Sequence, residues 1–188
     1  IGEEALAGGK RRVLACGTLG LMDRFERFRD PPLRLPSEMS AIIADPTRFA
    51  LIDKVIALDE HTSLLTETTL STELHPFLVD HAIDGVPYHP GVMALEMFAE
   101  NALLLKPTTC LAGFENVSFG VPVKLLKDEI KVRVVAEYNN SDGDIHWINC
   151  KLVSDLMNSK GEIFGEREHH SATVRLVEKS DDLSNFLQ

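Results

Sequence analysis

From residue 50 onwards, apolar and polar positions alternate along most of the chain, which predicts a mainly β structure. Alternation with a period of two is typical of strands that bury one face. Polar turn residues at 139–143 and 158–161 separate the longest of these runs and predict hairpins there. The predicted strands are residues 50–59, 63–70, 82–88, 112–119, 129–139, 144–157 and 162–176.

One segment breaks this alternation and predicts the only long helix, residues 91–105. Its sequence, GVMALEMFAENALLL, is apolar on nearly all sides except at Glu96, Glu100 and Asn101. Pro90 and Gly91 stand where such a helix would begin. A helix that is apolar almost all round is expected to be buried, so the pattern predicts long antiparallel strands around one central helix.

The residues before and within this helix carry candidate acid–base chemistry. His81 precedes a Gly/Pro-punctuated loop, and Glu96 lies in the second turn of the helix. Apolar neighbours should partly desolvate Glu96 and raise its pKa, so that it could hold a proton while a neutral imidazole acts as base. The free N–H groups at the helix start could receive a carbonyl oxygen. A single histidine or glutamate is nevertheless more often a structural residue than a catalytic one.

Three motifs in order resemble a known family. The segment DHAIDGVPYHPG matches the H-x-x-x-G-x-x-x-x-P signature of polyketide synthase dehydratase domains, and LHPFLVDH is similar to the approach to their histidine. HPGVMALEMFAE resembles the helix of stand-alone β-hydroxyacyl carrier-protein dehydratases, with Glu96 on the catalytic acid. FENVSFGVPVKLLKDEIKV resembles their strand pair, with Phe119, Pro122, Val123 and Asp128 in matching places.

This resemblance implies an α+β fold, a single hot dog in which a long antiparallel sheet wraps around one helix. It implies that His81 abstracts the α proton of a 3-hydroxyacyl thioester and that Glu96 protonates the departing hydroxyl. The candidate substrate-binding residues are Gly85, Tyr88, His89, Pro90 and Gly91, with the N–H of Gly85 or Gly91 on the thioester carbonyl. Of these, Tyr88 is expected mainly to pack, and His89 stands where the family usually has a hydrophobic residue. The implied partners are an acyl carrier protein, whose phosphopantetheine arm carries the substrate, and neighbouring synthase domains; no metal or other cofactor is expected.

The chain also departs from that family in ways that bear on its assembly. Polyketide synthase dehydratases usually fuse two hot dog folds, the second supplying an aspartate, whereas this chain has one copy and offers Glu96 instead. We therefore expect a homodimer of single hot dogs, or a partner half. Two alternatives stay open: an acyl thioesterase of hot dog fold, and a non-catalytic acyl-binding or dimerisation domain.

The expected domain organisation has three parts. Residues 1–48 form an N-terminal arm or linker with a Pro-rich connector, and its "VLACGTLG" pattern resembles the tail of a ketoreductase domain. Residues 49–178 form the hot dog domain, and residues 179–188 form a C-terminal tail.

Composition narrows the partners and the compartment. The net charge of −10 argues against nucleic acid. No apolar run reaches membrane-spanning length and no signal-peptide core is present, so a cytoplasmic protein is expected. Cys16, Cys110 and Cys150 are isolated thiols, which favours a reducing compartment.

The remaining candidates receive mainly structural interpretations. Met93, Met97 and Phe98 could line an acyl tunnel, but core packing is the expected role. His169 and His170 should point to opposite faces of a strand, and His61, His75 and His146 lack ligand spacing, so no metal site is expected. One basic stretch is interpreted as a solvated strand face that an acidic carrier protein could also use; it comprises Lys124, Lys127, Lys131 and Arg133.

Overall fold

The computed structural model describes residues 49–59 and 62–179. Eight strands and two helices follow one another along this part of the chain. The predicted arm at residues 1–48 and almost all of the predicted tail lie outside the described residues. The elements are β1 (Lys54–Asp59), β2 (Ser63–Ser71), α3 (Phe77–Asp80), β3 (Ala82–Ile83), β4 (Val86–Pro87), α4 (Gly91–Leu105), β5 (Thr109–Phe119), β6 (Glu129–Asp142), β7 (Ile145–Met157) and β8 (Ile163–Glu178).

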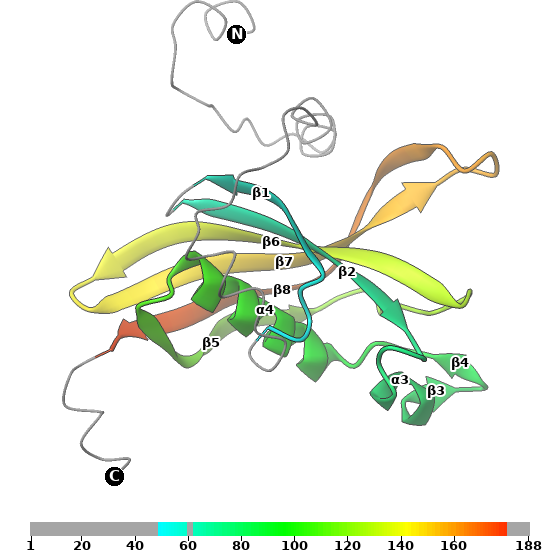
Figure 1. The fold of residues 1–188 in the computed structure, drawn as a ribbon, viewed down its shortest axis with the longest axis horizontal. Helices are drawn as coiled ribbons and strands as arrows, with labels where there is room; N and C mark the ends of the chain where they lie inside the picture. Colours follow the sequence, from blue (N-terminus) through cyan, green and yellow to red (C-terminus); the bar gives the residue numbers. More distant parts are fainter. Residues whose placement is uncertain (1–48, 60–61, 180–188) are drawn as a thin grey trace, which may run out of the picture.

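Six of the strands form one antiparallel sheet in the order β1-β2-β6-β7-β8-β5. Figure 1 shows α4 lying across one face of this sheet. The strands β1 and β5 are its two edges. This is the predicted hot dog arrangement, and the predicted helix at residues 91–105 is confirmed in full.

The strand pattern follows directly from the sequence. On β6, Val132, Val134 and Ala136 have at most 1% of their surface exposed and belong to the core under α4. The residues between them point to the other face, as the period of two requires. Gly143 and Gly161 take positive φ values of 58° and 80° at the two hairpin turns, a conformation that glycine adopts without strain.

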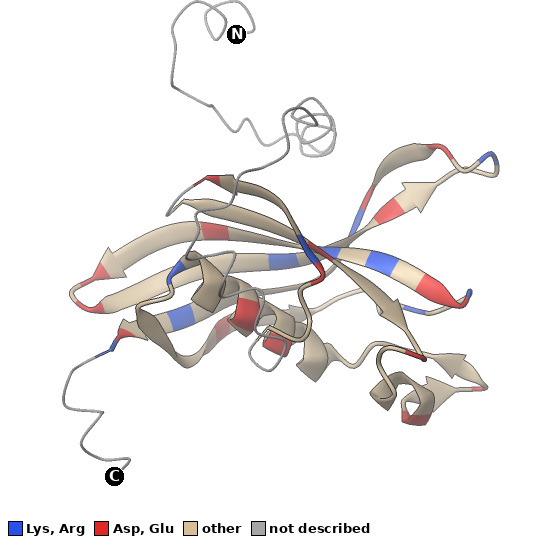
Figure 2. Ribbon diagram, viewed as in Figure 1, with Lys and Arg blue, Asp and Glu red and all other residues tan. Residues whose placement is uncertain are grey.

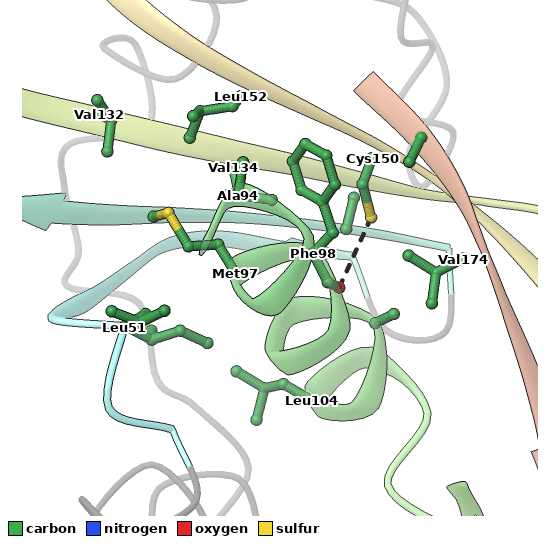
Figure 3. Packing of buried hydrophobic residues seen from close by; sticks show 14 of the residues in the cluster. Leu51, Ala94, Met97, Phe98, Leu104, Val132, Val134, Cys150, Leu152 and Val174 are labelled. Atoms are coloured by element: carbon green, nitrogen blue, oxygen red, sulfur yellow. Dashed lines mark hydrogen bonds between the residues drawn. The ribbon is translucent and has the colours of Figure 1, made fainter. Parts of the chain in front are cut away.

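Phe98 lies at the centre of the core, with none of its surface exposed. Around it, α4 and the sheet bury aliphatic side chains, including Met97 and Leu152, in one continuous cluster (Figure 3). The buried thiol of Cys150 lies 3.9 Å from the main-chain oxygen of Phe98. Met97 and Phe98 therefore have the expected packing role.

Polar contacts fix α4 against its neighbours. Thr66 Oγ1 on β2 donates to Asn101 Oδ1 at 2.7 Å, and Asn101 Nδ2 donates to the carbonyl of Met97 at 2.8 Å. The N–H of Leu51 donates to Glu100 Oε2 at 2.9 Å. Buried groups paired in this way hold the helix in one register against the sheet.

The predicted strand at residues 82–88 is wrong in form. The chain makes a two-residue turn at Asp84 and Gly85, both with positive φ, between the short strands β3 and β4. Asp-Gly favours this type of turn. Three further boundaries differ by three residues or more: β1 begins at Lys54 rather than residue 50, β5 begins at Thr109 rather than residue 112, and β6 continues through the expected turn to Asp142.

Candidate active site

His81 is held by its neighbours in one orientation. It follows the short helix α3, and its main-chain N–H donates to the carbonyl of Phe77 at 3.2 Å. Its ring Nδ1 lies 2.9 Å from the carbonyl oxygen of Tyr88. A carbonyl oxygen only accepts hydrogen bonds, so Nδ1 carries the hydrogen and the Nε2 of the neutral ring keeps its lone pair. The side chain is exposed, so Nε2 is accessible as a base.

The loop after His81 is closed by main-chain hydrogen bonds. The N–H of Tyr88 donates to the carbonyl of His81 at 2.9 Å, so the two residues bond each other through ring and main chain. The N–H of His89 then donates to the carbonyl of Val123 at 3.0 Å. The Tyr88 ring also lies 5.2 Å from the ammonium nitrogen of Lys124. The half-buried Tyr88 and Pro90 thus form the short connection between His81 and α4.

The N-terminus of α4 offers free donors. Pro90 is the N-cap residue, and within the described part of the chain the N–H groups of Gly91 and Val92 have no acceptor. The Phe119 ring lies over this helix start, since a Cβ on Gly91 would come within 2.8 Å of its Cδ1 and Cε1. Any other residue at position 91 would therefore displace this ring. The two N–H groups, with the positive end of the helix dipole, could stabilise an oxyanion.

Glu96 lies on the same helix, but its side chain is exposed. The expected partial burial of Glu96 is therefore wrong for the single chain. Val92, one turn earlier, is also 68% exposed, so this side of the helix lies away from the sheet. Between the two catalytic candidates, the described residues show neither a hydrogen bond nor an ion pair.

Glu100, one turn after Glu96, has the buried environment expected for Glu96. It is 5% exposed, and burial raises its pKa to about 7; repulsion from Glu96 adds to the increase, and the hydrogen bond from Leu51 opposes it. The acidic positions of α4 are visible in Figure 2. The two glutamates that share a helix face thus have opposite exposures.

Replacing Glu100 with glutamine should remove a pH dependence of stability. The folded-state pKa of about 7 lies above the ordinary value of 4.5, so the wild type should lose stability as pH rises from 4.5 through 7, by about 3 kcal/mol relative to the variant. Glutamine stays neutral and can still accept from Leu51. Urea unfolding at pH 4.5 and pH 8 measures the difference. Glu96→Gln is the control on the same helix and should keep most of the pH dependence, because burial is a larger cause of the raised pKa of Glu100 than repulsion from Glu96. Parallel pH profiles for the wild type and Glu100→Gln would contradict the assignment.

Gly85 lies at the tip of the β3–β4 hairpin. A Cβ at this position would have no other atom within 4 Å, and the φ of Gly85 is 75°. Glycine serves the turn there. Of the two donors suggested for the thioester carbonyl, Gly91 has the advantage of the fifteen-residue helix behind it.

A group of five histidines surrounds this site, and their grouping was not expected from the sequence. We call His75, His81, His89, His169 and His170 the histidine cluster. Burial lowers the pKa of His89 to about 3, with repulsion from His170 the next largest cause and the other members adding to it. These histidines lie in two segments some eighty positions apart in the sequence, so they come close together only in the folded structure.

His169 and His170 do not alternate as predicted. Leu152 pairs with His170 but Val153 pairs with Glu168, so His169 is the extra residue of a β-bulge. Both side chains are buried, and their ring centroids are 6.3 Å apart. His169 is fully bonded, through Nδ1 to the carbonyl of Val121 at 2.7 Å and through Nε2 to Ser154 Oγ at 2.8 Å.

The basic stretch divides into two parts. Lys131 pairs with Glu67 at 3.5 Å, and the buried Arg133 is bonded by Asp155 and Glu166. Lys124 and Lys127 are exposed, and Leu126 between them is 78% exposed. Of this stretch, these two lysines therefore remain as a basic surface without an ion pair among the described residues, and Lys124 lies beside Tyr88.

The described residues contain neither a candidate metal site nor a candidate membrane-spanning helix. No three His, Cys, Asp or Glu side chains there are grouped as a metal ion would need. No helix in the same part of the chain has the length and apolarity to cross a membrane.

Comparison with known sequences gives one family. The family model of the polyketide synthase dehydratase domain matches residues 50–148, just over half of the 188 residues. The match includes His81, Glu96 and the connection between them. No curated protein matches the chain.

Solved structures show the same fold at low identity. A chain of the dehydratase heterocomplex ApeI:P from Xenorhabdus doucetiae is 15% identical with a TM-score of 0.57, over 83% of this chain and 100% of that one. The dehydratase domain from the CurF module of curacin polyketide synthase is 13% identical with a TM-score of 0.55, over 74% of this chain but only 50% of that domain. A thioesterase family protein from Silicibacter pomeroyi is 15% identical with a TM-score of 0.53, over 74% and 94%.

Proposed function

The chain belongs to the polyketide synthase dehydratase domain family, and from that premise we propose that it removes water from a 3-hydroxyacyl thioester on an acyl carrier protein. The observation that carries the proposal is the orientation of His81. Its Nδ1 is bonded to a main-chain carbonyl, and its free Nε2 is accessible on the loop that leads to the helix start. A neutral imidazole fixed in this tautomer is suited to act as a general base.

In the proposed reaction, His81 Nε2 takes a proton from C2 of the acyl chain. The C–H electrons form the C2–C3 double bond while the thioester oxygen is stabilised by the N–H of Gly91. Glu96 gives its proton to the leaving hydroxyl, and the C3–O bond breaks to release water. The imidazolium proton then returns the glutamate to its acid form through solvent. The thioester carbonyl itself acidifies C2, so the steps call on no metal or redox cofactor.

We propose that a second hot dog unit completes the site, in the simplest case another copy of this chain. Among the described residues, no strand pairs with the outer side of the edge strand β5, and Val117 and Phe119 on it are 41% and 55% exposed. Such an edge is suited to pair with another strand. The exposure of Glu96 and its lack of contact with His81 fit an acid–base pair formed between two units. The chain also aligns with only half of the CurF dehydratase domain, as expected when a single hot dog unit is compared with a domain of two units.

The exposed Lys124, Leu126 and Lys127 are the surface we assign to the carrier protein. They lie on the loop that pairs with residues 87–89, next to the proposed substrate entry. The chain as a whole is strongly acidic, with a net charge of −10, so an acidic partner would be repelled by much of the remaining surface.

Reversing both charges, in Lys124→Glu with Lys127→Glu, should raise KM for a carrier-protein substrate about tenfold at low salt, because the reversed charges then repel the partner. The kcat for a pantetheine-linked substrate should not change. Steady-state kinetics with both substrates separate the two effects. Lys54→Glu with Lys160→Glu, at two exposed lysines in β1 and in the turn before β8, is the control with the same change in total charge. Equal losses with both substrates would remove the docking assignment.

Two alternatives are distinguished by the reaction product. Hot dog thioesterases are among the structures with this fold, and a non-catalytic domain could share it too. The test is to incubate the full chain with 3-hydroxyhexanoyl-pantetheine and identify the products by mass spectrometry. Release of the enoyl thioester supports the dehydratase; free 3-hydroxy acid would identify a thioesterase, and unchanged substrate would favour a binding role.

A further inference from the structure

Two members of the histidine cluster are buried without a hydrogen-bond partner. His89 is 2% exposed and His170 is 5% exposed, and among the described residues neither ring nitrogen of either side chain has a partner. Their neighbour His169 is as deeply buried but has both nitrogens bonded. His75 and His146 each leave only Nδ1 buried and unpaired, so among the described histidines only His89 and His170 have both ring nitrogens buried without a partner.

Main-chain bonds to residues 120–123 connect the two chain segments that carry His89 and His170, and the two rings are close enough to repel each other when protonated. His89 is attached to Val123 at one end of this segment, and the N–H of Gly120 donates to the carbonyl of His169 at 2.9 Å at the other. Phe119, just before it, contacts the His170 ring with centroids 5.6 Å apart and also lies over Gly91. The pair therefore lies beside the start of α4, next to the proposed thioester site.

Both rings are neutral near pH 7. Burial lowers the pKa of His170 as well as that of His89, and repulsion from a neighbouring histidine adds to each decrease; for His170, the main chain of His169 acts in the opposite direction. A neutral imidazole has one N–H donor and one nitrogen acceptor. The pair therefore presents two donors and two acceptors to whatever lies between or beside the rings.

Leaving these groups unsatisfied is costly, by roughly 1 to 3 kcal/mol for each buried group, while apolar side chains of similar shape would avoid that cost. A metal ion is an unsuitable occupant, because the described residues offer no third ligand in place. A small neutral group with its own hydroxyl would satisfy the rings, since a hydroxyl can donate to one nitrogen and accept from another.

We propose that His89 and His170 form a polar subsite for a hydroxyl substituent of the acyl chain beyond C3, so that the domain prefers an oxygenated chain to a plain alkyl chain. The proposal rests on the dehydratase function proposed above and names its substrate class. His89 directly precedes Pro90 and Gly91, where the thioester carbonyl would bind, so a substituent a few bonds along the chain can reach the pair.

The kinetic test compares 3,5-dihydroxyhexanoyl-pantetheine with 3-hydroxyhexanoyl-pantetheine. The wild type should show at least about a tenfold higher kcat/KM for the dihydroxy substrate. The monohydroxy substrate has no C5 hydroxyl and would leave the buried His89 and His170 rings without hydrogen bonds. His170→Phe and His89→Leu should both lose this preference, and His170→Phe should keep kcat for the monohydroxy substrate within about twofold. His146→Phe is the control, because its ring contacts Tyr138 and Glu178 instead of the cluster.

Binding tests the subsite without relying on catalysis. Calorimetry with 5-hydroxyhexanoyl-pantetheine and hexanoyl-pantetheine, neither of which can lose water from C3, should give a Kd about tenfold lower for the hydroxylated ligand. Equal Kd values, or an unchanged preference in His170→Phe and His89→Leu, would overturn the proposal and leave the pair with a structural water only. A preference in binding without any enoyl product would retain the subsite and reject the dehydratase function.

Discussion

Replacing His81 with alanine should lower kcat for dehydration by about 100- to 10,000-fold, because the proton at C2 then has no positioned base. The side chain is exposed, so the free energy of unfolding should change by less than about 0.5 kcal/mol. Single-turnover formation of the enoyl thioester measures the first effect, and urea unfolding measures the second.

His146→Ala is the matched control for this experiment, since that histidine is bonded to Glu178 on β8 and has no proposed part in the reaction. Its kcat should equal that of the wild type. Full activity in His81→Ala would remove the basis of the proposed mechanism, even if the fold and the family remain.

Replacing Glu96 with glutamine should lower kcat by about 100-fold or more, because an amide has no acidic proton for the leaving hydroxyl. The same substitution at Glu100, one turn along α4, should leave kcat within about twofold, since that side chain is buried against Leu51. Comparison of Glu96→Gln with Glu100→Gln distinguishes a catalytic carboxyl group from a structural one, because the same substitution is made at both positions. A large loss in Glu100→Gln and none in Glu96→Gln would exchange the two roles.

Mixing inactive His81→Ala and Glu96→Gln chains tests where the acid and base meet. If each site takes His81 from one copy and Glu96 from the other, one site of every mixed dimer is intact, which restores about one quarter of wild-type activity at equal mixing. Pairing within one chain would restore nothing in a mixed dimer, since each copy then lacks one of the two groups. Restored activity therefore requires a shared site.

The α4 helix and the sheet around it were predictable because each is fixed by local pattern. Pro90 and Gly91 mark the helix start, and the apolar run after them has no strand period. The β3–β4 hairpin was missed although Asp84 and Gly85 carry its turn signal, since the apolar residues on both sides resemble one continuous strand.

The candidate site was predictable only in part. The sequence places Glu96 in the second turn of the helix, but its exposure depends on which side of α4 faces the sheet. Because most residues of α4 are apolar on every side, the sequence does not indicate which side of the helix faces the sheet. The histidine cluster depends on residues 119–125, which bond to residues 87–89 on one side and to residues 169–170 on the other. It also depends on the bulge at His169, and a bulge shifts side-chain direction in a way that alternation does not predict.

The hydrogen bond that orients His81 has a consequence for tolerance to mutation. Its acceptor is the main-chain oxygen of Tyr88, which every amino acid provides, so the tautomer of the base does not depend on the identity of the side chain at position 88. Insertion or deletion of a single residue between the two positions would instead displace the acceptor. The length of this loop is therefore constrained more strictly than its composition, and the reactive geometry is robust to substitution but vulnerable to a change in chain length.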